Sequence, residues 1–189
     1  MQEISKFLSS IFNDTGKLVS YNKRELFARQ GIPLPSIGIV ISGGFKLIYK
    51  NGKKEWIKSF VFSKGILGSI PSLLENKPSS YAIQSIEKSE VLVIESFLLQ
   101  KSLQENNQYY IYLSKFLADL YLQKEKRIYE FLILTPEERY RNFISDYNEN
   151  VNKISQIDQA AYLGITNVAL SRIKKRIFTS GVKHLEPKS

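Results

Sequence analysis

The sequence contains no cysteine and only one histidine, and this shortage removes most metal and redox chemistry. Without cysteine the chain forms no disulfide, thiolate metal site or iron–sulfur cluster. A cupin-type metal enzyme needs several histidines, whereas the only one here, His184, is expected to be a solvated tail residue. A Gly-rich phosphate loop and a nucleophile elbow are missing too. We therefore expect no enzyme, no bound metal and no cofactor.

Long hydrophobic runs are also missing. No apolar run approaches the roughly 18 residues that a membrane-spanning helix needs, so no membrane partner is expected. The first 17 residues carry acidic side chains and have no continuous apolar stretch before a cleavage site, unlike a signal peptide. A cytoplasmic location is the expectation that fits.

Positive charge is in excess and is concentrated near the C-terminus. The chain has 27 basic and 18 acidic residues, a net charge of +9. Residues 151–189 hold 7 of the basic and 2 of the acidic residues, which is +5 of that total. Such a balance favours a polyanionic partner, but it needs a motif beside it before it indicates nucleic-acid binding.

The pattern of the chain divides it into three parts. Residues 4–13 suggest a short helix, and residues 18–95 hold seven short runs rich in β-branched and aromatic residues. Asn51-Gly52 between two such runs is a strong hairpin signal. Closely spaced strands followed by helices from Ser96 predict an α+β fold: a jelly-roll-like β-roll, a long dimerisation helix and a helix-turn-helix. The expected domains are 1–106, 107–134 and 135–189.

The long helix expected over 107–134 carries two apolar stripes, so two of its faces must be buried. Tyr110, Leu117, Tyr121 and Ile128 form the stripe expected to cover the roll. The other stripe has no obvious partner within the chain. A central helix in a monomer is the alternative, but we favour pairing with a second copy. The expected dimer interface is Tyr109, Leu113, Phe116, Leu117 and Leu120.

Residues 155–177 form the most specific motif. Ser155 is suited to cap one helix and Thr166 a second, and Gly164 permits a tight turn between them. Ala160 lies where the two helices must approach closely. Apolar spacing predicts a small core, and a plain helical hairpin is the alternative reading. The expected core residues are Ile157, Leu163, Ile165, Leu170 and Ile173.

The remaining side chains of the second helix are typical of a recognition helix. Short polar groups near its N-terminus suit the edges of bases in the major groove, and cations suit phosphates. The residues expected at base edges are Asn167, Val168, Ser171 and Arg172. Those expected at phosphates are Lys153, Thr166, Lys174, Lys175 and Arg176.

A β-roll, a long helix and a helix-turn-helix ending in LSRIKKRI together resemble the CRP/FNR family of bacterial transcription regulators. Gly65-Ile66-Leu67-Gly68 and the stretch at 77–94 strengthen the resemblance. It implies a homodimer that presents two recognition helices to successive major grooves of a pseudo-palindromic site. The expected partners are double-stranded DNA, a second copy of the chain, RNA polymerase and an unknown small-molecule effector held in the roll.

The sequence departs from the cyclic-nucleotide-binding branch of that family at both anchors. A glutamate and an arginine bind the nucleotide there, and the matching positions are Ser69 and Ser79 here. Ser79-Ser80 is therefore expected to close a loop, and cyclic AMP is not expected to bind. The pocket residues offered instead favour a neutral or apolar guest: Ile66, Leu67, Gly68, Ser69, Ser79, Ser80 and Tyr81.

Two further points complete the expectations. Only 12 residues follow Ile177, so the hairpin wing of the family is expected to be truncated. The alternative function is a ligand-binding or protein-interaction module of the same fold without sequence-specific DNA binding.

Overall fold

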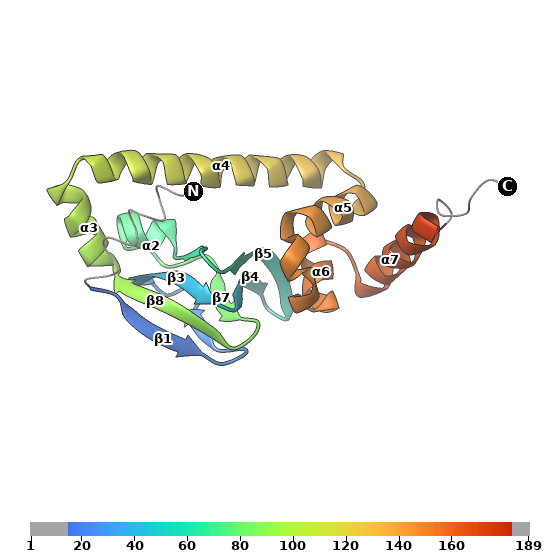
Figure 1. Cartoon of the computed structure of the whole chain (residues 1–189), viewed down its shortest axis with the longest axis horizontal. Coiled ribbons are helices and arrows are strands. Elements are labelled where there is room, and N and C mark those ends of the chain that lie inside the picture. Colours follow the sequence, from blue (N-terminus) through green and yellow to red (C-terminus); the bar gives the residue numbers. More distant parts are fainter. Residues whose placement is uncertain (1–14, 183–189) are drawn as a thin grey trace. The chain divides into compact units, whose positions relative to one another are not determined.

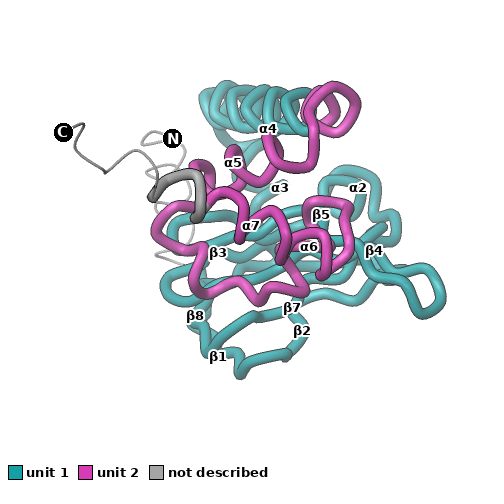
Figure 2. Tube along the Cα trace, turned by 90° about the vertical axis from the view of Figure 1, so that its right-hand side faces the viewer, with its two compact units in different colours: residues 1–127 teal, residues 128–189 magenta. Residues whose placement is uncertain are grey.

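The computed structural model describes residues 15–182, so the helix expected at 4–13 and the expected tail histidine His184 lie outside the described residues. The chain divides into two compact units, Met1–Arg127 and Ile128–Ser189 (Figure 2). Each unit has its own buried core and is described separately below.

Unit 1 is built on two four-stranded sheets whose paired strands are all antiparallel (Figure 1). The strand orders are β1-β8-β3-β6 and β2-β7-β4-β5. This arrangement confirms the α+β class and the β-roll. The strands are β1 Lys17–Tyr21, β2 Leu26–Ala28, β3 Ser36–Ser42, β4 Gly44–Asn51, β5 Lys54–Phe62, β6 Ile66–Leu67, β7 Ala82–Ser85 and β8 Ser89–Glu95.

The β4–β5 hairpin turns where the sequence predicts it. Asn51 pairs with Lys54, and Gly52 has a φ of +59°, a left-handed conformation that glycine adopts without a steric penalty. Two elements differ from the expected strand pattern: the two-residue strand β6 and the short helix α2 (Ile70–Glu75). Pro71 lies in the first turn of α2, and Asn76 ends it with a φ of +52°.

Apolar side chains fill two clusters in unit 1. One cluster takes its members from strands of both sheets and includes Phe45, Leu67, Tyr81, Ile83 and Val91. The other joins Ile37 and Ile94 to Leu73 of α2 and to two leucines of α3 (Ser96–Glu105). The first cluster therefore holds the two sheets together, and the second holds α2 and α3 against the roll.

Helix α4 (Gln108–Ile133) packs on the roll with the other apolar stripe from the one that the sequence suggested. Tyr109, Leu113 and Phe116 pack against the second cluster, so the expectation that this stripe lacks a partner within the chain is wrong. Leu117 and Leu120 are half-buried. Many other apolar residues of the helix are exposed, and they include Tyr110, Ile111, Tyr121, Leu122, Ile128, Tyr129, Leu132 and Ile133. Helical spacing identified both stripes but not which one meets the roll.

No helix within the described range 15–182 is both long enough and apolar enough to cross a membrane.

Unit 2 contains the end of α4 and four further helical segments: α5 (Pro136–Tyr147), η1 (Asn148–Lys153), α6 (Gln156–Leu163) and α7 (Asn167–Val182). α5 begins with a capping box at Thr135. The Thr135 hydroxyl accepts from the backbone N–H of Glu138 at 3.3 Å, and the Glu138 carboxylate accepts from the Thr135 N–H at 2.8 Å. The Glu138 carboxylate also accepts from the Thr135 hydroxyl at 2.7 Å, and this hydrogen bond together with the one from the Thr135 N–H lowers the pKa of the Glu138 carboxyl.

Four aromatic rings form the centre of unit 2. Phe143 of α5 is fully buried, and its ring centroid lies 5.1 Å from that of Tyr147 and 5.2 Å from that of Tyr162. Tyr140 stacks on Phe143 from one helical turn before it. Such tilted and stacked contacts add to the burial of the rings themselves.

Candidate functional site

Helices α6 and α7 are joined by a tight turn whose geometry follows from the sequence. The Ser155 hydroxyl caps α6 by accepting from the N–H of Asp158 at 3.1 Å. Gly164 ends that helix with a φ of +68°, and the Ile165 N–H donates to the Ala160 carbonyl at 3.1 Å. The Thr166 hydroxyl then accepts from the N–H of Ala169 at 3.1 Å and starts α7. The two caps and the turn form a helix-turn-helix.

The turn packs closely on the last part of α4. A Cβ atom added to Gly164 would lie 2.8 Å from Cε1 of Phe131, closer than carbon atoms normally approach. Gly164 is therefore required by its backbone conformation and also by the ring beside it.

The apolar side of α7 is buried, as the sequence predicts, with one exception in α6. Leu170, Ile173 and Leu163 are buried, and Ile165 is half-buried. Ile157 was expected in the same core but is 70% exposed. It lies in the first turn of the eight-residue α6, before the part of the helix that contacts its neighbours, so its helical spacing gave the wrong prediction.

The opposite side of α7 is exposed. Asn167, Val168, Ser171, Arg172 and Lys175 all have exposed side chains. Three of them carry hydrogen-bonding groups or a charge within the first six residues of the helix, where a recognition helix meets base edges. Lys153 and Thr166 are exposed as well.

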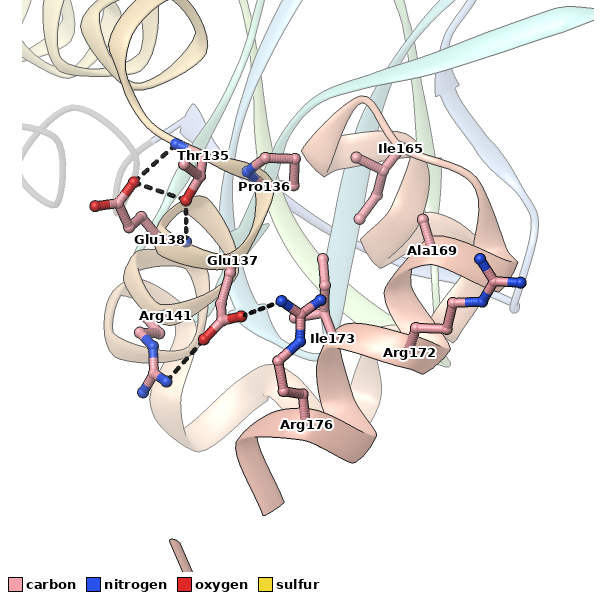
Figure 3. A pocket seen from close by; sticks show the side chains of 10 residues that line it. All are labelled: Thr135, Pro136, Glu137, Glu138, Arg141, Ile165, Ala169, Arg172, Ile173 and Arg176. Atoms are coloured by element: carbon pink, nitrogen blue, oxygen red, sulfur yellow. Dashed lines mark hydrogen bonds and ion pairs between the residues drawn. The ribbon is translucent and has the colours of Figure 1, made fainter. Parts of the chain in front are cut away.

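Two cations of α7 are engaged inside unit 2. The Lys174 ammonium lies 5.8 Å from the centroid of the Tyr140 ring, and burial lowers the pKa of Lys174. Arg176 forms an ion pair with Glu137 at 3.3 Å (Figure 3). Any contact of Arg176 with a phosphate would have to compete with this carboxylate.

Glu137 and Arg141 of α5 were not singled out in the sequence. The Glu137 carboxylate accepts from Arg141 at 3.0 Å and from Arg176 on its other side, so it lies between two guanidinium groups (Figure 3). A pocket of about 550 Å³ opens beside them, between the start of α5 and α7, and Arg172 also lines it. The spacing of Glu137 and Arg141 as an i,i+4 pair was the signal available in the sequence.

The end of α7 lies in the segment where the sequence predicts a truncated wing. The helix continues to Val182, so the segment directly after Ile177 extends the helix and forms no hairpin strand. The rest of the segment expected to hold a truncated wing, 183–189, lies beyond the described range.

In unit 1, the residues expected to line a ligand pocket are mostly engaged in packing. Leu67 and Tyr81 belong to the first apolar cluster, the one that contains Phe45, and Ile66 packs against the second. Gly68 is half-buried and Ser80 is exposed. The Ser79 hydroxyl donates to the carbonyl of Tyr81 at 2.8 Å and accepts from the Tyr81 N–H at 3.4 Å, which closes the loop locally. The buried Ser69 side chain makes no capping hydrogen bond to α2, and the Tyr81 hydroxyl donates to the Gly68 carbonyl at 2.7 Å.

Within residues 15–182, no three His, Cys, Asp or Glu side chains are grouped as metal ligands would be.

Comparison with known proteins gives the fold over nearly the whole chain. Residues 18–106 match the family model described as the cyclic nucleotide-binding domain. The chain is similar to the structure of FixK2 from Bradyrhizobium japonicum, with 21% identity, a TM-score of 0.79, and coverage of 88% of this chain and 86% of that one. None of the curated protein sequences matches it.

Two further solved structures share the fold. The global regulator CLP of Xanthomonas campestris, described as responsive to c-di-GMP, has 16% identity, a TM-score of 0.75, and coverage of 97% of this chain and 96% of that one. The catabolite activator protein of Thermus thermophilus has 18% identity and a TM-score of 0.56, with coverage of 96% and 85%. Identities at this level establish the arrangement of the chain, while the chemistry of the site rests on its own residues.

Proposed function

We propose that this chain is a DNA-binding transcription regulator of the CRP/FNR type that acts as a homodimer in the cytoplasm. The observation that carries the proposal is the exposed face of α7, with Asn167, Ser171 and Arg172 in the first half of a helix that follows a capped, glycine-containing turn. Helices of this kind enter the major groove with their N-terminal residues. The fold shared with two proteins described as a global regulator and a catabolite activator supports the same function.

The roles within α7 divide by chemistry. Arginine can bind guanine with two hydrogen bonds and asparagine can do the same with adenine, while Val168 suits a thymine methyl group. Lys175, together with Lys153 and Thr166, suits phosphates, where contacts fix the register without reading sequence. Lys174 and Arg176 are assigned to phosphates as well, after release from Tyr140 and Glu137.

Arg172→Ala and Lys175→Ala should weaken DNA binding in different ways. Arg172→Ala should cost about 1–3 kcal/mol on a selected operator and relax the preference at one base pair in each half-site. Lys175→Ala should weaken binding to operator and random duplex alike, and should lower the salt slope by about one for each phosphate that is no longer neutralised. Fluorescence anisotropy with both duplexes over a range of salt concentrations measures both effects.

The exposed Lys23 in unit 1 provides a matched control, because Lys23→Ala removes the same charge far along the chain from α7. It should leave both affinities unchanged. If the unaltered chain binds no duplex at low salt, the protein is instead a ligand-binding or interaction module. If Arg172→Ala leaves affinity and sequence preference unchanged, α7 is not the reading helix.

Cyclic AMP should not bind with a dissociation constant of about 10 µM or tighter, which corresponds to roughly −7 kcal/mol. The Ser79 hydroxyl is hydrogen-bonded within its own loop. Ser69 has no carboxylate to accept from a ribose hydroxyl, and Ser79 has no positive charge to pair with the phosphodiester. Isothermal titration calorimetry with the full chain measures this directly, and a tight binding heat would contradict the proposed independence from cyclic AMP.

The remaining partners follow from the same proposal. A second copy of the chain would cover the exposed face of α4, which carries Tyr121 and Ile128. A regulator of this type would also contact RNA polymerase, and a small-molecule effector would bind in unit 1.

A further inference from the structure

The side of α4 that faces the roll changes from apolar to cationic along its length. Tyr109, Leu113 and Phe116 pack against the second apolar cluster of unit 1. Lys124 and Arg127 follow on the same side of the helix, at steps of three and four residues, and both are half-buried. A helix face that packs on its own domain is ordinarily continued by apolar residues, so two cations there call for a physical reason.

Strand β5 brings a third cation to the same region. The Arg127 guanidinium donates to the carbonyl of Ile57 at 3.4 Å, which brings α4 beside the strand position that precedes Lys58. The Lys58 ammonium lies 3.6 Å from the centroid of the Tyr81 ring. Lys58, Lys124 and Arg127 thus come from two elements to one region between β5 and α4.

The charges of this cluster repel one another. Burial, followed by the charge of Lys124, lowers the pKa of Lys58 to about 8. Burial, followed by the charge of Arg127, lowers the pKa of Lys124. Within the described part of the chain, neither lysine forms an ion pair with a carboxylate.

The aromatic rings beside the cluster compensate these charges only in part. Tyr81 is buried, and burial raises its pKa to about 12, so the ring stays neutral and offers only its quadrupole to Lys58. Tyr49 packs edge-on against Tyr81 with ring centroids 6.0 Å apart, and burial raises its pKa too. Lysine stems often cover apolar surface while the ammonium reaches water, but here an ammonium lies over a buried ring.

We propose that Lys58, Lys124 and Arg127 bind a small polyanion, of the class of phosphorylated metabolites with two or more negative charges. A group with several anionic oxygens forms charge-assisted hydrogen bonds with the two lysines and places negative charge beside Arg127, which offsets the repulsion among the three cations. The site differs in chemistry from the neutral or apolar guest that Ile66–Ser69 and Ser79–Tyr81 favour. The role of the bound anion as an effector rests on the proposed regulator function. The binding of the anion does not depend on that function.

Calorimetric titration of the full chain with inorganic pyrophosphate at pH 7 tests the site, with chloride holding the ionic strength constant. Lys58→Gln and Lys124→Gln should each weaken binding by about tenfold or more, as expected when a charge-assisted hydrogen bond is removed. Lys126→Gln is the matched control, because it removes the same charge from an exposed position two residues from Lys124. Its effect should stay below about twofold.

The pH dependence gives a second readout with sulfate, whose charge is constant between pH 7 and pH 9. Because the pKa of Lys58 is about 8, roughly a tenth of this side chain is neutral at pH 7 and about nine tenths at pH 9. Sulfate binding should therefore weaken with rising pH and take up protons near pH 8, since the anion favours the charged ammonium. Lys58 faces the charge of Lys124 on α4 and the ring of Tyr81. Arg127 acts in turn on Lys124 and on Tyr49. Lys58→Gln should flatten this profile.

Thermal unfolding and DNA titration separate the remaining outcomes. Lys58→Gln and Lys58→Met should unfold at the same or a higher temperature, because each removes a half-buried charge. Both should bind random duplex as the unaltered chain does. The proposal is wrong if pyrophosphate does not bind at millimolar concentration, if both glutamine variants bind it normally, or if Lys58→Gln weakens duplex binding as Lys175→Ala does. A chain that binds pyrophosphate but no duplex would contradict the regulator function and leave the anion site standing.

Discussion

Replacing Tyr121 and Ile128 together by aspartate should convert the protein from a dimer to a monomer. The two side chains are 66% and 60% exposed and lie two helical turns apart on the outer face of α4. A symmetric dimer repeats each substitution, so four apolar groups are removed from the interface. At about 1.5 kcal/mol or more for each, the loss is roughly 6 kcal/mol before the cost of desolvating the carboxylates.

Sedimentation equilibrium at tens of micromolar measures the mass, and anisotropy with an operator duplex measures the loss of simultaneous binding to two half-sites. Leu18→Asp, at an exposed leucine of β1, is the matched control and should remain dimeric. Leu113→Asp should act differently, by lowering the free energy of unfolding, because Leu113 packs inside unit 1. An unaltered chain that sediments as a monomer would refute the dimer.

Phe143→Ala should unfold unit 2 and leave the β-roll folded. The Phe143 side chain is 1% exposed and packs against three tyrosine rings with centroid distances of 5.1, 5.2 and 6.5 Å. Truncating a buried phenylalanine costs about 3–5 kcal/mol, which is comparable with the whole stability of a domain of this small size. The variant should therefore lose duplex binding without any change to α7 itself.

Differential scanning calorimetry and near-ultraviolet circular dichroism measure this outcome for each unit. The transition of unit 2 should move down or vanish, while that of unit 1 persists. Phe97→Ala removes the same ring from an exposed position in α3, and it should change neither transition. Retention of full duplex affinity by Phe143→Ala would show that the aromatic cluster is not what holds the recognition helix in its fold.

Local signals in the sequence predicted the parts of the fold that local chemistry determines. Asn51-Gly52 predicted a hairpin, and Ser155, Gly164 and Thr166 predicted two caps and the turn between them. Each of these depends on residues within a few positions of one another.

Features that depend on distant contacts were missed or assigned wrongly. The stripes of α4 are equally apolar, so only the contacts of Tyr109, Leu113 and Phe116 with the roll decide which face is inside. Ile157 is exposed because α6 meets its neighbours after its first turn. The pairing of Lys58 with α4 joins residues far apart in the chain, and no spacing in the sequence predicts it.

Because Gly164 lies so close to the ring of Phe131, a substitution at one of these positions depends on the residue at the other. A side chain at 164 would meet two obstacles, the left-handed backbone at a cost of about 1–2 kcal/mol and the ring 2.8 Å from its Cβ. Asparagine can relieve the first obstacle, and only a smaller residue at 131 can relieve the second. The end of α4 therefore limits which residues the turn accepts. Related sequences that lack glycine at position 164 should also lack an aromatic residue at position 131.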